Sequence, residues 1–108
     1  MVNIQTATQL ALSFDEAIEL PHFDLTSFRV KKKIFATLSG ETSMACVKLN
    51  LIDQSVFCLM DPATIYPVPN KWGLQGWTIV HLHTISKAVL TDILTTAYNE
   101  LMKPAAKN

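Results

Sequence analysis

The sequence holds few of the residues on which several common kinds of site depend. Of its 108 residues only two are cysteine and three are glycine. Small secreted domains that rely on disulfides carry four or more cysteines, which excludes a disulfide scaffold. No CxxC pair occurs, which argues against a zinc or thioredoxin-like site. We expect Cys46 and Cys58 to be buried, reduced thiols that pack as small hydrophobic side chains.

Signatures of catalysis are missing as well. The glycines stand at positions 40, 73 and 76, so no glycine-rich loop is available to cradle a phosphate. There is no G-x-S-x-G segment, and neither cysteine lies beside a histidine or at a helix start that would lower its pKa. His81 and His83 lie two residues apart on an expected strand, and His22 would be a third zinc ligand. An exposed HxH pair is common, however, and no acidic partner accompanies it. We expect neither an enzyme nor a bound metal or cofactor.

Long apolar runs and an excess of charge are also absent. Nine basic residues balance nine acidic ones at pH 7, which disfavours bulk electrostatic binding to nucleic acid but leaves a local basic patch open. Polar residues interrupt every apolar stretch before the about 20 residues that cross a bilayer, and the first residues do not resemble a secretory signal. The hydrophobic share of 49% suits one core. We expect a single cytoplasmic domain over residues 1–108 without a membrane partner.

Hydrophobic periodicity divides the chain into helices and strands. Spacings of three and four predict helices over 4–14, 51–60 and 85–102. Alternation predicts strands over 27–30, 33–38, 43–49 and 77–82, with an extended edge over 65–69. We expect a last turn or loop over 15–20, a loop over 70–76, and a frayed tail over 103–108. This order predicts an α+β fold of two layers, α-β3-α-β2-α, with an antiparallel sheet and helices over one face.

The same periodicity assigns side chains to faces. In the strand over 33–38, Phe35 is expected on one face and the other face carries Ile34, Ala36 and Leu38. In the helix over 51–60, the apolar side is formed by Ile52, Val56, Leu59 and Met60.

Four of the nine basic side chains gather at or near the tip of one expected hairpin, at Arg29, Lys31, Lys32 and Lys33. Such a hairpin can lie along a phosphate backbone, where each neutralised phosphate adds salt-sensitive affinity. Charged residues at a hairpin tip also serve simply to keep a sheet edge soluble. Because two lysines suit a tight turn of positive φ poorly, we expect a loose turn at Lys31-Lys32.

Both tryptophans stand beside glycines, in Lys71-Trp72-Gly73 and Gly76-Trp77. Trp72 lies next to a lysine, so its ring could stack on a base or insert into a partner's pocket. The alternative is that the ring closes the end of the hydrophobic core. We expect Trp77 to pack under the final helix.

These segments resemble the MmcQ/YjbR family from about Leu10 to the end of the chain. The most specific block is Tyr66–Gly73 with Gly76–Thr78, and the other matching stretches are Ala11–Phe14, Glu19–Phe23, Ser27–Val30, Lys33–Leu38 and Val47–Leu49. The resemblance implies the same α-β3-α-β2-α fold, a label as a double-wing DNA-binding protein, and no agreed catalytic residue. It places candidate nucleic-acid contacts at Arg29, Lys31, Lys32, Lys33, Lys71 and Trp72.

Two departures from the family pattern affect this expectation in opposite directions. Lys31-Lys32 replaces the frequent Asn-Gly turn and adds charge to the hairpin, whereas Asp24 follows His22-Phe23 where a glycine is frequent and adds an acid nearby. Two functions therefore stay open. One is a non-catalytic DNA-binding module. The other is a protein- or small-ligand-binding domain, which includes self-association, because the high apolar fraction can leave an exposed patch.

Overall fold

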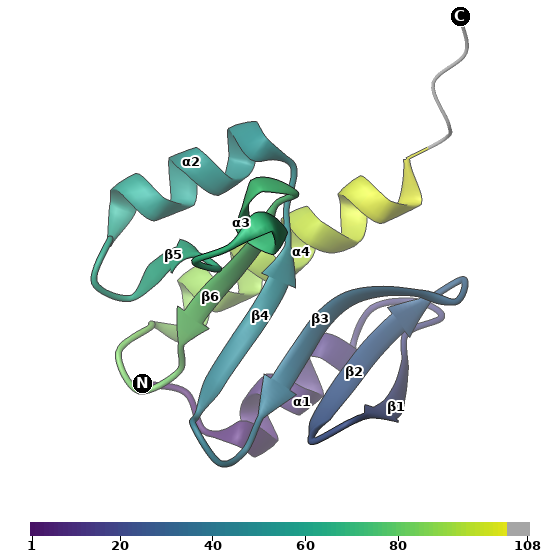
Figure 1. Cartoon of the computed structure of the whole chain (residues 1–108). Coiled ribbons are helices and arrows are strands. Elements are labelled where there is room, and N and C mark those ends of the chain that lie inside the picture. The colour runs from purple at the N-terminus through teal and green to yellow at the C-terminus, as the bar shows by residue number, and fades with distance from the viewer. Residues whose placement is uncertain (104–108) are drawn as a thin grey trace, which may run out of the picture.

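The computed structural model describes residues 1–103, in which four helices and six strands follow one another (Figure 1). In chain order they are α1 (Ile4–Leu12), β1 (Ile18–His22), β2 (Leu25–Val30), β3 (Lys33–Ser39), β4 (Met44–Lys48), α2 (Leu51–Met60), β5 (Ile65–Pro67), α3 (Lys71–Leu74), β6 (Trp77–His81) and α4 (Lys87–Met102). Of the tail expected to fray, Lys103 caps α4, and residues 104–108 lie outside the described residues. Within residues 1–103 no helix is both long and apolar enough to cross a membrane.

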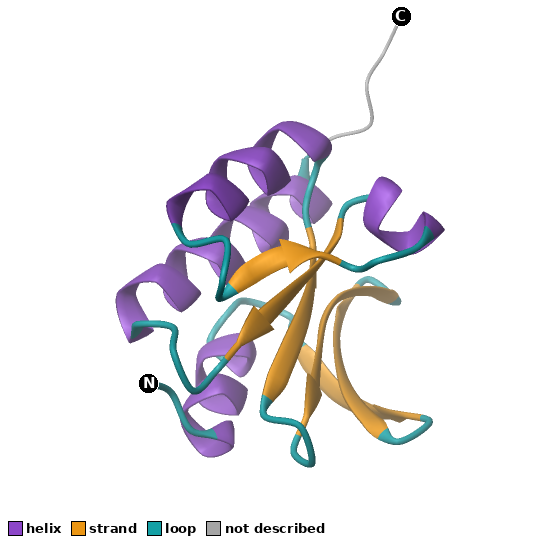
Figure 2. Ribbon diagram, turned by 60° about the vertical axis from the view of Figure 1, so that its left-hand side comes forward, coloured by secondary structure: helices purple, strands orange, loops and turns teal. Residues whose placement is uncertain are grey.

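The strands form one antiparallel sheet in the order β1-β2-β3-β4-β6-β5. Its two edge strands each contain a proline, Pro21 in β1 and Pro67 in β5. Figure 2 shows α1, α2 and α4 on one side of the sheet and the short α3 on the other. We call these the helix side and the open face. The largest fully buried apolar side chains are Phe28, Phe35, Leu49, Ile65, Leu82, Leu90 and Ile93. The α+β fold class is confirmed.

The element order differs from the expectation at two places, β1 and α3. A last turn or loop was expected over 15–20, but residues 18–22 form a strand that pairs with β2 from Ile18↔Arg29 to His22↔Leu25. Every residue of β1 is exposed or half-buried, so no alternation of burial marks it, and an edge strand tolerates Pro21. The short α3 replaces part of the expected loop because Asn70 caps it, its side chain accepting a hydrogen bond of 2.8 Å from the Trp72 N–H. Four strands therefore precede α2 instead of three.

A β-bulge in β3 changes which side chains face the helices. Phe28 pairs with Ala36, while the next residue, Arg29, pairs with Ile34, so Phe35 has no partner. Phe35 and Ala36 are both buried, and Phe35 meets the ring of Phe14 edge-on at 6.0 Å. Ile34 is left on the open face. The expectation that Ile34 and Ala36 share a face opposite Phe35 is therefore wrong.

The turn between β2 and β3 is tight. Lys31 and Lys32 have φ values of 54° and 69°, and Val30 pairs directly with Lys33 across them. Both lysines therefore occupy the left-handed region that a two-residue hairpin turn of the I′ type requires. The expected loose turn is wrong, because the strand pairing on both sides imposes the geometry.

The helix α2 turns its apolar side outward. Asn50 caps it, with its side-chain oxygen 2.8 Å from the Asp53 N–H, and Gln54 is its buried residue. The side expected to face the core is exposed at Ile52, Val56, Leu59 and Met60. The residues that instead pack against the core are Phe57 and Cys58. The physical reason is that Gln54 supplies hydrogen bonds that the neighbouring backbone needs, and this fixes the rotation of the helix.

Candidate functional site

A groove of about 430 Å³ lies on the open face of the sheet. It is walled on one side by β1 and β2 and on the other by α3, as the curl of the sheet in Figure 2 shows. Its lining is mainly apolar and consists of His22, Leu25, Ile34, Thr37, Cys46, Val68, Trp72 and Trp77. A smaller hollow of about 270 Å³ shares Leu25, Thr37 and Cys46 and extends it toward Met44. We call the two together the open-face groove.

Trp72 owes its position in this groove to the tight packing of α3. A Cβ at Gly73 would overlap with the carbonyl oxygen of Val68, so glycine alone lets the helix approach the chain before it. From the other side Gln54 Nε2 donates to the Gly73 carbonyl oxygen at 3.0 Å. Trp72 itself is 50% exposed and therefore available to a ligand.

Trp77 lies in the same groove and not beneath the final helix, which corrects the expectation for this residue. It begins β6 and pairs with Lys48, and its half-buried ring lines the open face. The next residue, Thr78, is buried and turns toward the helix side. Side chains alternate along a strand, so the burial of Thr78 sends Trp77 to the open face.

Both cysteines are free, and both are half-buried instead of buried. Cys46 lines the groove, where burial raises the pKa of its thiol to about 11. Burial also raises the pKa of Cys58. Neither thiol is activated as a nucleophile, because the thiolate is the reactive form.

The basic candidates lie on two segments that both reach the open-face groove. Lys31, Lys32 and Lys33 are exposed at the β2–β3 turn, and Lys71 is exposed on α3. Lys71 directly precedes Trp72, which lines the groove. Lys33 precedes the groove residue Ile34 within a strand, so its own side chain turns to the helix side.

Arg29 is the candidate that the structure holds in place. It pairs with Ile34 across the strands, and its Nε donates a hydrogen bond of 2.9 Å to the Ser27 hydroxyl. Since Ile34 lies on the open face, Arg29 lies there as well. Glu19 in β1 pairs with Phe28, a core residue, so this acid does not share a face with Arg29.

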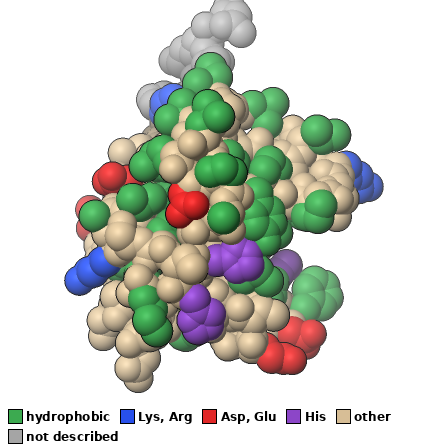
Figure 3. All heavy atoms as spheres, turned by 90° about the vertical axis from the view of Figure 1, so that its left-hand side faces the viewer, with side chains coloured by type: hydrophobic (Ala, Val, Ile, Leu, Met, Phe, Trp, Pro, Cys, Tyr) green, Lys and Arg blue, Asp and Glu red, His purple; other side chains and the backbone are tan. Residues whose placement is uncertain are grey.

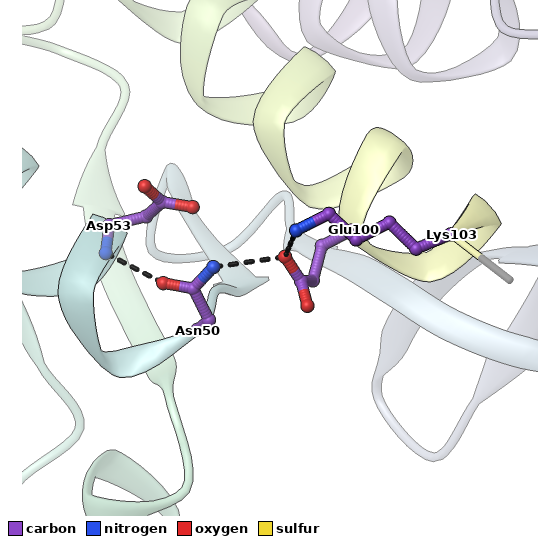
Figure 4. A network of polar contacts seen from close by, with 4 residues as sticks. All are labelled: Asn50, Asp53, Glu100 and Lys103. Atoms are coloured by element: carbon purple, nitrogen blue, oxygen red, sulfur yellow. Dashed lines mark hydrogen bonds and ion pairs between the residues drawn. The ribbon is translucent and has the colours of Figure 1, made fainter. Parts of the chain in front are cut away.

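A second basic hollow, of about 300 Å³, lies on the helix side at the same end of the sheet. Lys33 lines it together with two lysines that sequence reasoning missed, Lys48 and Lys103. Figure 4 shows Glu100 accepting hydrogen bonds there from Asn50 at 2.9 Å and from Lys103 at 3.1 Å. The Asn50 hydrogen bond and then Lys103 lower the pKa of Glu100. No sequence pattern connects these residues, because the end of β4 and the end of α4 meet only in the folded chain.

The three histidines do not converge on one ion. The ring of His81 is hydrogen-bonded through Nε2 to the hydroxyl of Tyr66, His83 is exposed, and His22 lines the groove beside Phe23. Within residues 1–103 there is no group of three or more His, Cys, Asp or Glu side chains that could hold a metal ion.

Comparisons with known proteins agree with this architecture. A family model described as YjbR matches residues 12–100. The crystal structure of Deinococcus radiodurans protein DR2400, which carries the family-model domain DUF419, superimposes with a TM-score of 0.81 and 18% sequence identity. The alignment covers 100% of this chain and 84% of that chain, and at this identity it supports the fold alone. No curated protein matches the sequence.

Proposed function

This chain belongs to the YjbR family, and we propose that it is a non-catalytic domain that binds nucleic acid across the open face of its sheet. The observation that carries the proposal is that Arg29 pairs on the open face with Ile34, and that Ile34 and the exposed Trp72 line the same groove. Positive charge at the walls attracts phosphates, and aromatic rings inside accept bases by stacking.

The open face supports this proposal through the sign of its charges. Within β2 and β3, the charged residue that turns to this face is Arg29, which pairs with Ile34. Arg29 is basic. The zero net charge of the chain is therefore compatible with a locally basic surface, because association depends on the charges near the bound phosphates. The proposal places the protein in the cytoplasm, where nucleic acid is present and free thiols such as Cys46 and Cys58 stay reduced.

The test is fluorescence anisotropy of labelled single- and double-stranded oligonucleotides across a salt series. With about four phosphate contacts, the affinity should fall by roughly two orders of magnitude between 50 and 200 mM salt. A matched pair of variants locates the site. Lys32→Glu changes an exposed lysine at the hairpin tip, and Lys87→Glu makes the same change in an exposed lysine at the start of α4.

The two lysines lie at different ends of the molecule. Lys87 begins α4, about 20 Å of helix before Glu100, which borders the basic hollow. Lys32→Glu should weaken binding and reduce the salt slope by about one, whereas Lys87→Glu should leave both unchanged. Absence of binding at low salt, or equal weakening by the two variants, would refute the proposal.

A second candidate function is the binding of a small apolar ligand, favoured by the groove itself. Its volume of about 430 Å³ lies in the range of small-molecule sites, which are mainly apolar with a few polar groups. Titration with an anilinonaphthalene sulfonate dye, followed by tryptophan quenching, tests it. Cys46→Phe should fill the groove floor and abolish this binding, and unchanged binding in that variant would exclude the groove as the site.

A further inference from the structure

The most unusual surface of the molecule is the outward side of α2. Its exposed large apolar side chains include Ile52, which is 76% exposed, and Leu59, which is 82% exposed. The complete set is Leu51, Ile52, Val56, Leu59 and Met60, which we call the α2 face. At 100° per residue these positions fall within one half of the helix circumference, so they form one continuous stripe.

Figure 3 looks onto the side of the molecule where α2 lies, and hydrophobic side chains reach the surface across its upper half. Ser55 is the polar residue within the stripe, and its hydroxyl is already donated to the Ile52 carbonyl oxygen at 2.8 Å. Between Asp53 and Asp61 the sequence carries no charge. Monomeric proteins rarely present so many large apolar side chains together, and a surface of this kind marks an interaction site.

We propose that the α2 face is a self-association surface on which a second copy of this chain packs its own α2. An identical copy brings an uncharged face to an uncharged face, so no buried charge is left unpaired. The zero net charge of the chain removes the long-range repulsion that keeps many proteins monomeric. The two packed faces therefore carry no charge themselves, and no net charge repels the two copies at long range.

The helix dipoles set the direction of the pairing. Acidic residues stand at both ends of α2, Asp53 half-buried in the first turn and Asp61 exposed after the last turn. Antiparallel packing places the positive N-terminal end of each helix dipole beside the negative C-terminal end of the other, whereas parallel packing would place like ends together. A twofold axis perpendicular to the helices produces this arrangement and closes the assembly at two copies.

The area of the face predicts the strength of the dimer. Five side chains that each lose about 100 Å² give about 500 Å² per copy and about 1,000 Å² in the pair, which is the lower limit of specific interfaces. The dimer is consequently weak, with a dissociation constant of about tens of micromolar. This inference does not depend on the proposed nucleic-acid binding, because the α2 face contains none of the open-face groove residues.

Sedimentation velocity of the full chain from about 5 to about 500 μM tests the proposal. The expected result is a concentration-dependent monomer–dimer equilibrium that Ile52→Glu and Leu59→Glu each weaken at least about tenfold. Phe23→Glu is the matched control, because Phe23 is 94% exposed at the β1–β2 turn and the change in net charge is the same. Leu59→Gln removes the apolar side chain without adding charge and should weaken the dimer as well.

Thermal unfolding followed by circular dichroism confirms that each variant is folded. A chain that stays monomeric over the whole range would overturn the proposal, even if a different protein were later found on the α2 face. So would a dimer that Phe23→Glu weakens as strongly as Leu59→Glu, because the effect would then come from charge and not from the face.

Discussion

The side-chain amide of Gln54 in α2 donates a hydrogen bond of 3.0 Å to the carbonyl oxygen of Gly73 in α3. The same nitrogen lies 3.1 Å from the Thr78 hydroxyl and 3.2 Å from the Trp77 carbonyl oxygen. One buried amide thus connects α2, which carries the apolar face, to α3 and β6, which carry the two tryptophans of the groove.

Replacing Gln54 with alanine should lower the free energy of unfolding by about 1–3 kcal/mol, because buried polar groups would lose their partner. Urea unfolding measures this change. Ser55→Ala is the control, since Ser55 is exposed and bonds only within its own helix, and it should change stability by less than about 0.5 kcal/mol. Equal effects of the two changes would show that Gln54 does not hold α3.

The three glycines should respond very differently to alanine. Gly76 has a φ of 109°, and a Cβ there would overlap with the Leu49 carbonyl oxygen, so Gly76→Ala should cost more than about 2 kcal/mol. Gly73→Ala should be similarly costly because of Val68. A Cβ at Gly40 meets nothing within 4 Å, so Gly40→Ala should cost less than about 0.5 kcal/mol. Thermal or urea unfolding of the three variants gives the comparison, and a severe effect at Gly40 would contradict it.

Replacing Lys31-Lys32 with Asn-Gly should stabilise the protein by about 1 kcal/mol, because Asn and Gly accept positive φ more readily than lysine does. Unfolding is best measured in about 0.5 M NaCl, which screens the repulsion between the two lysines. An unchanged or reduced stability would mean that the turn does not store the strain that its φ values of 54° and 69° imply.

The stability of the protein should fall as the pH rises from about 9 toward about 11. Burial raises the pKa of Cys46 from its ordinary value of 9.0 to about 11, so in this window the unfolded chain releases a proton that the folded chain retains. The protonated Cys46 thiol contributes about 1–2 kcal/mol to the free energy of unfolding, after allowance for the exposed part of the side chain. This contribution is fully present below pH 9 and is lost as the pH rises toward 11.

Urea unfolding of the natural chain and of Cys46→Ala across this pH range isolates the thiol, because the two proteins differ only in this side chain. The difference in stability between the two should shrink as the pH rises. A difference that stays constant from pH 8 to pH 11 would show that the Cys46 thiol ionises normally in the folded state.

Sequence patterns predict the elements of this fold well where a single segment carries the information. The helix α4 has a long apolar stripe and a serine cap, and apolar residues alternate along the sequence on both sides of the β2–β3 turn. The strand β1 carries no such pattern, because its pairing partner and not its own composition makes it a strand. The sequence pattern also does not predict which side of α2 faces the core. Its apolar residues outnumber the positions available in the core, and the hydrogen bonds of Gln54 determine the side that turns inward.

The candidate site, like the fold, could be predicted only in part from the sequence. The basic residues and Trp72 stand out in the sequence through their types, and the structure places Trp72 in the groove and Arg29 on the same face of the sheet. The groove itself is invisible in the sequence, because Leu25, Ile34, Thr37 and Cys46 come from three strands and meet only through the register. Ile34 in particular reaches the groove because of the bulge at Phe35, and no hydrophobic pattern reports which residue of a strand will be left unpaired.

The prolines in the two edge strands limit how copies of this protein can assemble. Pro21 and Pro67 have no N–H to donate, so neither outer strand offers a complete ladder to an incoming strand. The sheet therefore resists growth into ribbons or fibrils at both ends. A chain with a strongly apolar exposed helix but protected edges can associate in pairs while avoiding the open-ended assembly that sheet edges permit.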